Sequence, residues 1–175
     1  MKTLIAYYSL TGNNRKMAQE IANSMGAGKA EVDFEAIKDT AERPALTKNA
    51  TGADAKKISL KVMFSTGIAV FLKQGTRLKP LSKNPLDYGL LVFGTPMWMG
   101  RLPPATRAYA LALRGKVKRL AFFCVDGQTN PAGNLRELES ILGVKAQASL
   151  WLKADDFEQG GYGGKVKDFI KSLNA

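Results

Sequence analysis

The sequence predicts a doubly wound α/β fold, in which helices cover both faces of a five-stranded parallel sheet. Two observations predict it. Five strand-like runs alternate with helical segments, and three of these runs are almost continuously apolar while the other two are mixed. Strands buried on both faces of a parallel sheet have this continuous apolar character. The 175 residues are enough for a real core, so we expect a single domain spanning residues 1–175.

The strand order follows from which runs are mixed. The expected strands are residues 3–8, 30–37, 89–94, 119–125 and 146–152. In the second run Glu31, Asp33 and Glu35 alternate with apolar residues, so one face of that strand meets polar surroundings and the strand belongs at an edge. The fifth run is also mixed and suits the other edge. With the three apolar strands in the centre, the predicted order is 2-1-3-4-5.

Helical periodicity and helix-ending residues place the helices between these strands. We expect helices from Arg15 to Met25, from Pro103-Pro104 to Gly115, from about Ala132 to Leu142 with Gly143 as its stop, and from about Lys165 to Leu173. Residues 58–72 are also expected to be helical, after a long polar connection at 38–57.

The first loop of this arrangement is the most informative stretch of the chain. It lies between an apolar strand and a helix, and reads Ser9, Leu10, Thr11, Gly12, Asn13 and Asn14. The unpaired amides and dipole of a helix N-terminus attract an anion without needing a lysine. Gly12 lets the backbone approach a ligand closely. From these residues alone, a turn that merely caps the helix is an equally good interpretation.

In a doubly wound sheet, ligands bind beyond the carboxyl ends of the strands, at the point where the strand order reverses. Here that point lies between strands one and three. The loops that meet there are residues 9–14, 95–101 and 126–131.

Two of these loops resemble those of the flavodoxin family. The loop from Ser9 to Asn14 is similar to the family's FMN phosphate loop, which has hydroxyl residues around a Thr-Gly core. The run Gly94-Thr-Pro-Met-Trp-Met-Gly-Arg101, followed by Pro103-Pro104, resembles the second flavin loop of the longer-chain group. The resemblance spans roughly residues 3 to 173. It implies a flavodoxin-like fold with FMN as the cofactor.

The resemblance also implies which residues bind the flavin beyond the first loop. They are Thr95, Pro96, Met97, Trp98, Met99 and Gly100 after the third strand, and Asp126, Gly127 and Gln128 after the fourth. Trp98 would stack on the flavin ring, whereas without the resemblance a tryptophan folded into the core is the simpler interpretation. The amides from Met97 to Gly100 would address the N5 edge, and Gln128 the pyrimidine edge. The chain departs from the family in having no aromatic residue in the third loop and Asn14 where a hydroxyl residue is usual.

The composition excludes several kinds of chemistry. The chain has no histidine and one cysteine, so neither a Cys/His zinc site nor a His-assisted nucleophile is available. We therefore expect no metal site and no catalytic side chain, with the chemistry carried by the cofactor. Cys124, inside an apolar strand, is expected to be a packed small hydrophobe. The longest apolar stretch, residues 62–72, is too short to span a bilayer, which takes about 20 residues. No signal-peptide pattern opens the chain, so we expect a cytoplasmic protein.

The net charge of +11 is regional. Residues 44–119 hold 14 Lys and Arg against Asp54 and Asp87, while the rest of the chain is nearly balanced. A basic region favours an anionic partner, although a solvated basic face is an equally good interpretation. We expect an acidic redox protein as the partner, no nucleic acid, and Arg101 and Arg107 close to the flavin edge. The oligomeric state stays open.

The leading hypothesis is an FMN-binding electron carrier that works between protein partners. The alternative is an NAD(P)H-dependent FMN oxidoreductase of the quinone reductase type, and a third option is a binding module without cofactor. Flavodoxin-type quinone reductases usually have Arg-Phe-Gly-Asn in the second loop, where this chain has Met97-Trp-Met-Gly100, which favours the carrier. The basic charge argues the other way, because typical carriers are acidic.

Overall fold

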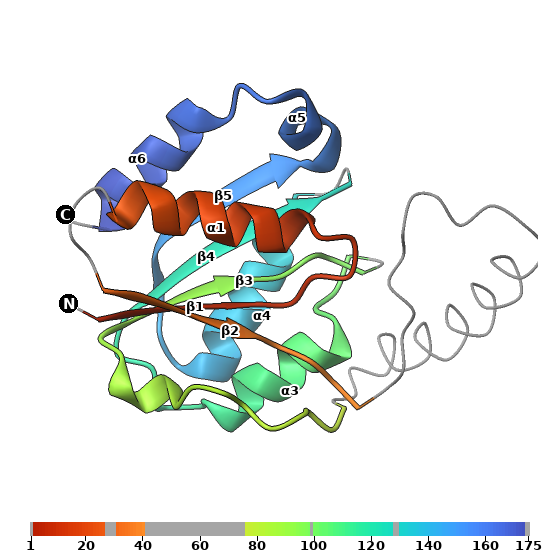
Figure 1. Cartoon of the computed structure of the whole chain (residues 1–175). Helices are drawn as coiled ribbons and strands as arrows, with labels where there is room; N and C mark the ends of the chain where they lie inside the picture. The colour runs from red at the N-terminus through yellow and green to blue at the C-terminus, as the bar shows by residue number, and fades with distance from the viewer. Residues whose placement is uncertain (1, 27–30, 41–75, 99, 128–129, 174–175) are drawn as a thin grey trace, which may run out of the picture.

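The computed structural model describes residues 2–26, 31–40, 76–98, 100–127 and 130–173. Five parallel strands form one sheet in the order β2-β1-β3-β4-β5 (Figure 1). They are β1 (Thr3–Tyr7), β2 (Val32–Ala36), β3 (Leu90–Gly94), β4 (Leu120–Asp126) and β5 (Ala146–Lys153). The predicted strand order is therefore confirmed, including both edge positions.

Helices pack on both faces of the sheet. One face carries α1 (Asn13–Gly26) and α6 (Gly163–Leu173), and the other carries α3 (Pro104–Ala112) and α4 (Ala132–Leu142) (Figure 1). Each of these helices was predicted, and α4 has the predicted bounds. The expected helix at 58–72 lies outside the described residues, as does nearly all of the connection at 38–57. Among the helices that the structure describes, none is long and apolar enough to cross a membrane.

Two short elements were not predicted. A single 3-10 turn, η1 (Pro85–Asp87), precedes β3, and α5 (Ala154–Gln159) follows β5. Both are shorter than two helical turns, so neither develops the repeated apolar spacing on which a helix prediction depends.

The core has one layer on each side of the sheet. On the α1 and α6 side, Ile5, Val92 and Phe123 pack against helix residues such as Met17 and Phe169. On the other side, the layer consists of Leu4, Phe93, Phe122, Tyr109 of α3 and Leu138 of α4, among others. Cys124 belongs to this second layer and is fully buried, and the burial raises the pKa of its thiol. This agrees with a packed side chain rather than a reactive one.

The polar face of β2 holds the segment that leads into β3. Glu35 is 4% exposed, and its Oε2 accepts hydrogen bonds from the Ser82 N–H, the Ser82 hydroxyl and the Lys83 N–H, at 2.8–2.9 Å. Tyr88 donates to Asp33 at 2.7 Å. Loss of hydration and this bond raise the pKa of Tyr88 to about 12. The acids predicted to face polar surroundings therefore have partners from within the chain.

Candidate functional site

The carboxyl ends of β1, β3 and β4 converge on a cavity of about 230 Å³. In Figure 1 these strand ends lie at the same end of the sheet as the start of α1. Nine predicted site residues line the cavity. They are Leu10, Thr11, Asn13 and Asn14 from the first loop, Pro96, Met97 and Trp98 from the second, and Asp126 and Gly127 from the third. Val125 and Ala154 complete the lining. The structure thus brings all three predicted loops to one hollow.

The first loop presents an open helix N-terminus. The first helical hydrogen bond runs from the Lys16 N–H to the Gly12 carbonyl at 2.9 Å, so the three preceding amides, those of residues 13 to 15, have no helical acceptor. The first turn of α1 contains no acidic side chain. Gly12 has a φ of +93°, which side chains rarely tolerate. Ser9 Oγ is buried and has no hydrogen-bond partner. This loop offers unpaired donors to an anion.

Asn14 joins the first loop to the third. Its side chain is 2% exposed, donates to the Val125 carbonyl at 3.1 Å and accepts from the Val125 N–H at 3.0 Å. Both polar atoms of the side-chain amide therefore bond β4, and the main-chain N–H of Asn14 has no helical acceptor. This pair fixes the distance between the helix start and the end of β4.

The second loop is fixed by its own hydrogen bonds. Thr95 is fully buried, and its hydroxyl lies 2.7 Å from that of Thr106 and donates to the Pro96 carbonyl at 3.0 Å. Trp98 and Arg101 exchange two backbone hydrogen bonds of 3.0 Å around Gly100, whose φ is +72°. Thr95 and Gly100 do not line the cavity, so the structure gives Thr95 a supporting place within the loop.

Trp98 lies between the core and the cavity. Its ring is half-buried and meets Tyr8 edge-on, with the ring centroids 5.6 Å apart at 66°. The same side chain lines the cavity. Both interpretations of this tryptophan thus have support, and stacking on a flavin stays a prediction.

Fewer loop amides are available than the sequence suggested. The Trp98 N–H donates to the Arg101 carbonyl at 3.0 Å, so it is used within the loop. Met99 lies outside the described residues, as does Gln128 of the third loop. Of the expected N5-edge donors that the structure describes, the amides of Met97 and Gly100 have no backbone acceptor.

Solved structures share this architecture along nearly the whole chain. A candidate flavoprotein from Bacteroides eggerthii matches with a TM-score of 0.71 at 16% identity, over 99% of this chain and 98% of its own. Flavodoxin 2 from Bacillus cereus, in its oxidised form, matches with a TM-score of 0.58 at 20% identity, over 99% and 98%. The fold is flavodoxin-like.

A further structural neighbour was solved with a ligand. The flavoprotein from Lactobacillus acidophilus, in complex with FMN, matches this flavodoxin-like chain with a TM-score of 0.59 at 20% identity, over 90% of this chain and 95% of its own. No family model matches the sequence, and neither does any curated protein.

The basic residues lie differently from the expectation. Arg107 is only 4% exposed, because its guanidinium binds the Glu137 carboxylate of α4 at 2.6 Å. The prediction that Arg107 faces a partner is therefore wrong. Arg114, Lys116 and Lys118 are exposed, but they lie in the connection from α3 to β4. This connection leads into the amino end of β4, whereas the cavity lies at the carboxyl ends of the strands, at the opposite end of the flavodoxin-like sheet.

A second hollow of about 430 Å³ flanks the first loop on the β2 side. Its lining includes Ser9, Thr11 and Gly12, together with the exposed cations Arg15 and Lys38. The first loop thus separates two hollows, one uncharged apart from Asp126 and one basic. No cluster of three or more His, Cys, Asp or Glu side chains suited to a metal occurs among the described residues.

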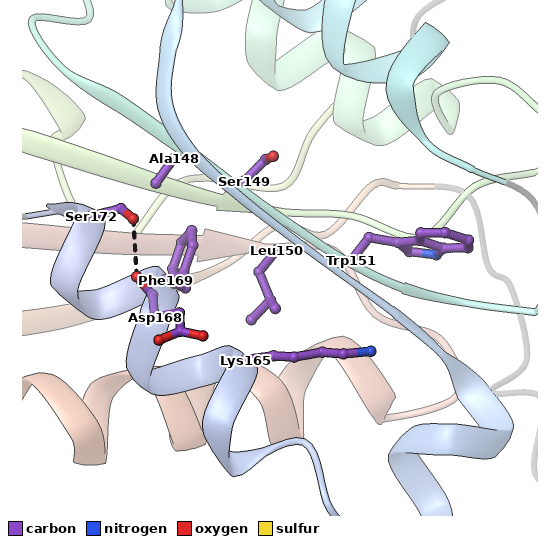
Figure 2. A pocket seen from close by; sticks show the side chains of 8 residues that line it. All are labelled: Ala148, Ser149, Leu150, Trp151, Lys165, Asp168, Phe169 and Ser172. Carbon is purple, nitrogen blue, oxygen red and sulfur yellow. Dashed lines mark hydrogen bonds between the residues drawn. The ribbon is translucent and has the colours of Figure 1, made fainter.

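A third hollow lies away from all three loops, beside the outer edge of β5. Figure 2 shows Leu150 pointing toward α6, where Phe169, Asp168 and Lys165 line the other side. This groove, of about 320 Å³, contains none of the predicted site residues.

Proposed function

We propose that this protein binds FMN in the loop cavity and works as an electron carrier between protein partners. The observation that carries the proposal is the convergence of the open α1 N-terminus, the Trp98 loop and the end of β4 on one hollow. The Lactobacillus acidophilus flavoprotein, which has the same fold, was solved with FMN. In a doubly wound sheet a ligand at this place is the general expectation.

The residues present fit the cofactor. The phosphate would take the unpaired amides at the start of α1 and the Ser9 hydroxyl, which is buried without a partner. Pro96, Met97 and Trp98 supply an apolar wall for a flat ring. No Gly-x-Gly-x-x-Gly sequence is present, which favours FMN over a dinucleotide.

When bound, FMN supplies reversible electron transfer, while the protein supplies orientation and the electrostatic environment. The Thr95–Thr106 contact and the Trp98–Arg101 bonds hold the second loop in one shape. The pair between Asn14 and Val125 keeps the first and third loops at a fixed spacing. We take the chain as one cytoplasmic domain, with an acidic redox protein as its partner.

One observation favours the alternative, an NAD(P)H-dependent FMN oxidoreductase. The second hollow adjoins the phosphate loop and carries Arg15 and Lys38, the kind of charge that binds a phosphorylated donor. The first loop lies between the two hollows, so a phosphorylated donor in the basic hollow would lie next to the flavin.

The visible spectrum of the purified protein tests the proposal first. We expect flavin absorption, either as purified or after adding FMN, and FMN rather than FAD after release by denaturation. A protein that stays colourless and binds no added FMN would contradict both flavin proposals and favour the third option, a binding module without cofactor. NADPH added without air then separates the two flavin proposals: rapid bleaching supports the reductase, and bleaching only with an added protein reductase supports the carrier.

A further inference from the structure

Two buried hydroxyls lie behind the second loop. Thr95 directly follows β3, Thr106 is the third residue of α3, and both are fully buried. Their hydroxyl oxygens are 2.7 Å apart. Neither residue lines the loop cavity. Thr95 was expected to bind the flavin, so its place behind the loop indicates a different role for this hydroxyl pair.

The direction of the hydrogen bonds in the hydroxyl pair follows from the number of protons. A threonine hydroxyl carries one proton and two acceptor lone pairs. The Thr95 hydroxyl donates its proton to the Pro96 carbonyl at 3.0 Å. The proton in the 2.7 Å contact must therefore come from Thr106. The bonds thus run in one direction, from Thr106 through Thr95 to the Pro96 carbonyl, and hydrogen bonds in such a series strengthen one another.

This series of bonds sets the orientation of one peptide group. None of the described peptide bonds is cis, so the Pro96 carbonyl and the Met97 N–H point in opposite directions. The carbonyl points toward the Thr95 hydroxyl, on the side of α3. The N–H therefore points away from α3. Met97 lines the cavity, and its N–H has no backbone acceptor.

The loop is anchored on both sides of this peptide. Before it, the Thr95 N–H donates to the Phe123 carbonyl of β4 at 3.2 Å. After it, Trp98 and Arg101 close their own turn with two backbone bonds. Between these anchors, the Pro96 carbonyl accepts the Thr95 hydroxyl. The hydroxyl pair therefore acts on the segment that joins the end of β3 to the Trp98 turn.

We infer that Thr95 and Thr106 are positioning residues for the second loop: together they turn the Pro96–Met97 peptide so that its N–H faces the cavity as a donor to a bound ring. Neither hydroxyl touches the ligand. The inference rests on the proposed function for the identity of the ligand, whereas the orientation of the peptide is a property of the protein alone.

The sequence allows this peptide to be observed without a ligand. Pro96–Met97 is the one Pro-Met pair in the sequence, so isotopic labelling of the proline carbonyl carbon and the methionine nitrogen gives a single NMR signal from it. Thr95→Val removes the donor to the carbonyl and should shift this signal. Thr106→Val should shift it less, and Thr106→Ser should restore the parent's position. A signal that Thr95→Val leaves unmoved overturns the inference.

Riboflavin is the probe for the second test, because it has the ring without the phosphate. Thr95→Val should lower riboflavin affinity about 3- to 10-fold, the range of one hydrogen bond. Thr106→Val weakens the remaining bond and should lower the affinity about 2-fold. In the double variant, Thr106→Val should add nothing to the loss, because Thr106 acts through Thr95. Losses that add in the double variant overturn the inference.

Urea unfolding separates positioning from packing. Each single variant leaves a buried hydroxyl without its partner, whereas the double variant removes both hydroxyls and avoids that cost. The double variant should therefore be at least as stable as Thr95→Val and should still bind riboflavin as weakly as Thr95→Val does. If riboflavin affinity recovers together with stability, the hydroxyls serve packing alone and the inference fails.

Thr3 provides a matched control. It lies at the amino end of β1, at the opposite end of the sheet, and is 1% exposed. Among the described residues its hydroxyl has no hydrogen-bond partner. Thr3→Val should change neither the NMR signal nor riboflavin affinity, and effects as large as those of Thr95→Val would overturn the inference. If the parent protein binds no flavin, the proposed function fails, while the NMR signal still decides the orientation of the peptide.

Discussion

The loop cavity and the groove beside β5 are hollows of similar size with very different chemistry. The groove is the larger, at about 320 Å³ against about 230 Å³. Its lining combines Lys165 with Asp168, and the Ser172 hydroxyl donates to a carbonyl of its own helix at 3.0 Å. Figure 2 shows that it lies between one strand edge and one helix. The loop cavity is lined from three strand ends and adjoins unpaired amides.

This difference teaches that volume does not identify the site. A ligand site needs a few convergent polar groups whose hydrogen-bonding capacity is not already used. In the groove the charges are balanced and exposed to water. The start of α1, which borders the loop cavity, has amides without helical acceptors, and Ser9 Oγ in the same loop has no partner inside the protein. Paired substitutions, one near the loop cavity and one away from it, would test this contrast.

The largest expected effect is on the phosphate. Thr11→Glu places a carboxylate at the proposed phosphate position, where repulsion between two charges about 5 Å apart is on the order of 3 kcal/mol at an effective dielectric of about 20. FMN affinity should fall by 100-fold or more, and riboflavin affinity far less, as fluorescence titration would show. Ser149→Glu, in the groove, should change neither. Equal losses for both flavins would place the phosphate elsewhere.

The second-largest expected effect is on the stability of the fold, for a substitution at the end of β3. A Cβ on Gly94 would collide with the ring of Phe123, which is fully buried. Overpacking of this kind costs about 1–3 kcal/mol, so Gly94→Ala should lower the urea midpoint. Gly163→Ala, at the start of α6, meets open space and should be neutral or stabilising by up to about 1 kcal/mol. A Gly94→Ala protein as stable as the parent would contradict the packing described for β3 and β4.

The two tryptophans permit a direct comparison of the regions. Trp98→Ala should weaken FMN and riboflavin alike, by about 0.5–1.5 kcal/mol beyond the buried area lost, and should relieve quenching of flavin fluorescence. Trp151→Phe, which alters the groove, should leave both unchanged. If Trp98→Ala binds both flavins as well as the parent does, the Trp98 side chain packs against Tyr8 and the core and does not contact the flavin.

Sequence patterns predicted the parts of the molecule that depend on local periodicity. The apolar runs gave the central strands, and the acids of β2 marked an edge, because alternation reports which face meets apolar core. The three loops followed from strand order, since the carboxyl ends of parallel strands meet at one edge. For that reason nine of the thirteen predicted site residues that the structure describes line one cavity.

What the sequence did not reveal depends on pairing at long range. The hydrogen bonds between the Asn14 side chain and the backbone of Val125 join positions 111 residues apart. The burial of Arg107 requires Glu137 on another helix. Composition counted Arg107 as a surface charge because arginine is seldom buried unless it is paired. Ala154 of α5 was also missed, since a six-residue helix carries too little pattern.

The smallest expected effect concerns the partner, and it now depends on fewer cations than the sequence suggested. With Arg107 buried and residues 114–118 at the far end of the sheet, Arg101 and Lys38 are the test positions at the cavity end. Charge around a transfer site speeds association with an opposite-signed partner, and salt screens it over about 10 Å at 0.1 M. Electron exchange with an acidic ferredoxin should therefore slow as salt rises.

Neutralising Arg101 and Lys38 together should slow this electron exchange several-fold at low salt and little at high salt. The control, Lys116→Gln with Lys118→Gln, should have no effect at either salt concentration. If the far-end pair matters as much, the charge acts through the whole molecule rather than at the flavin edge. A rate indifferent to salt in every variant would favour the oxidoreductase with a small neutral acceptor.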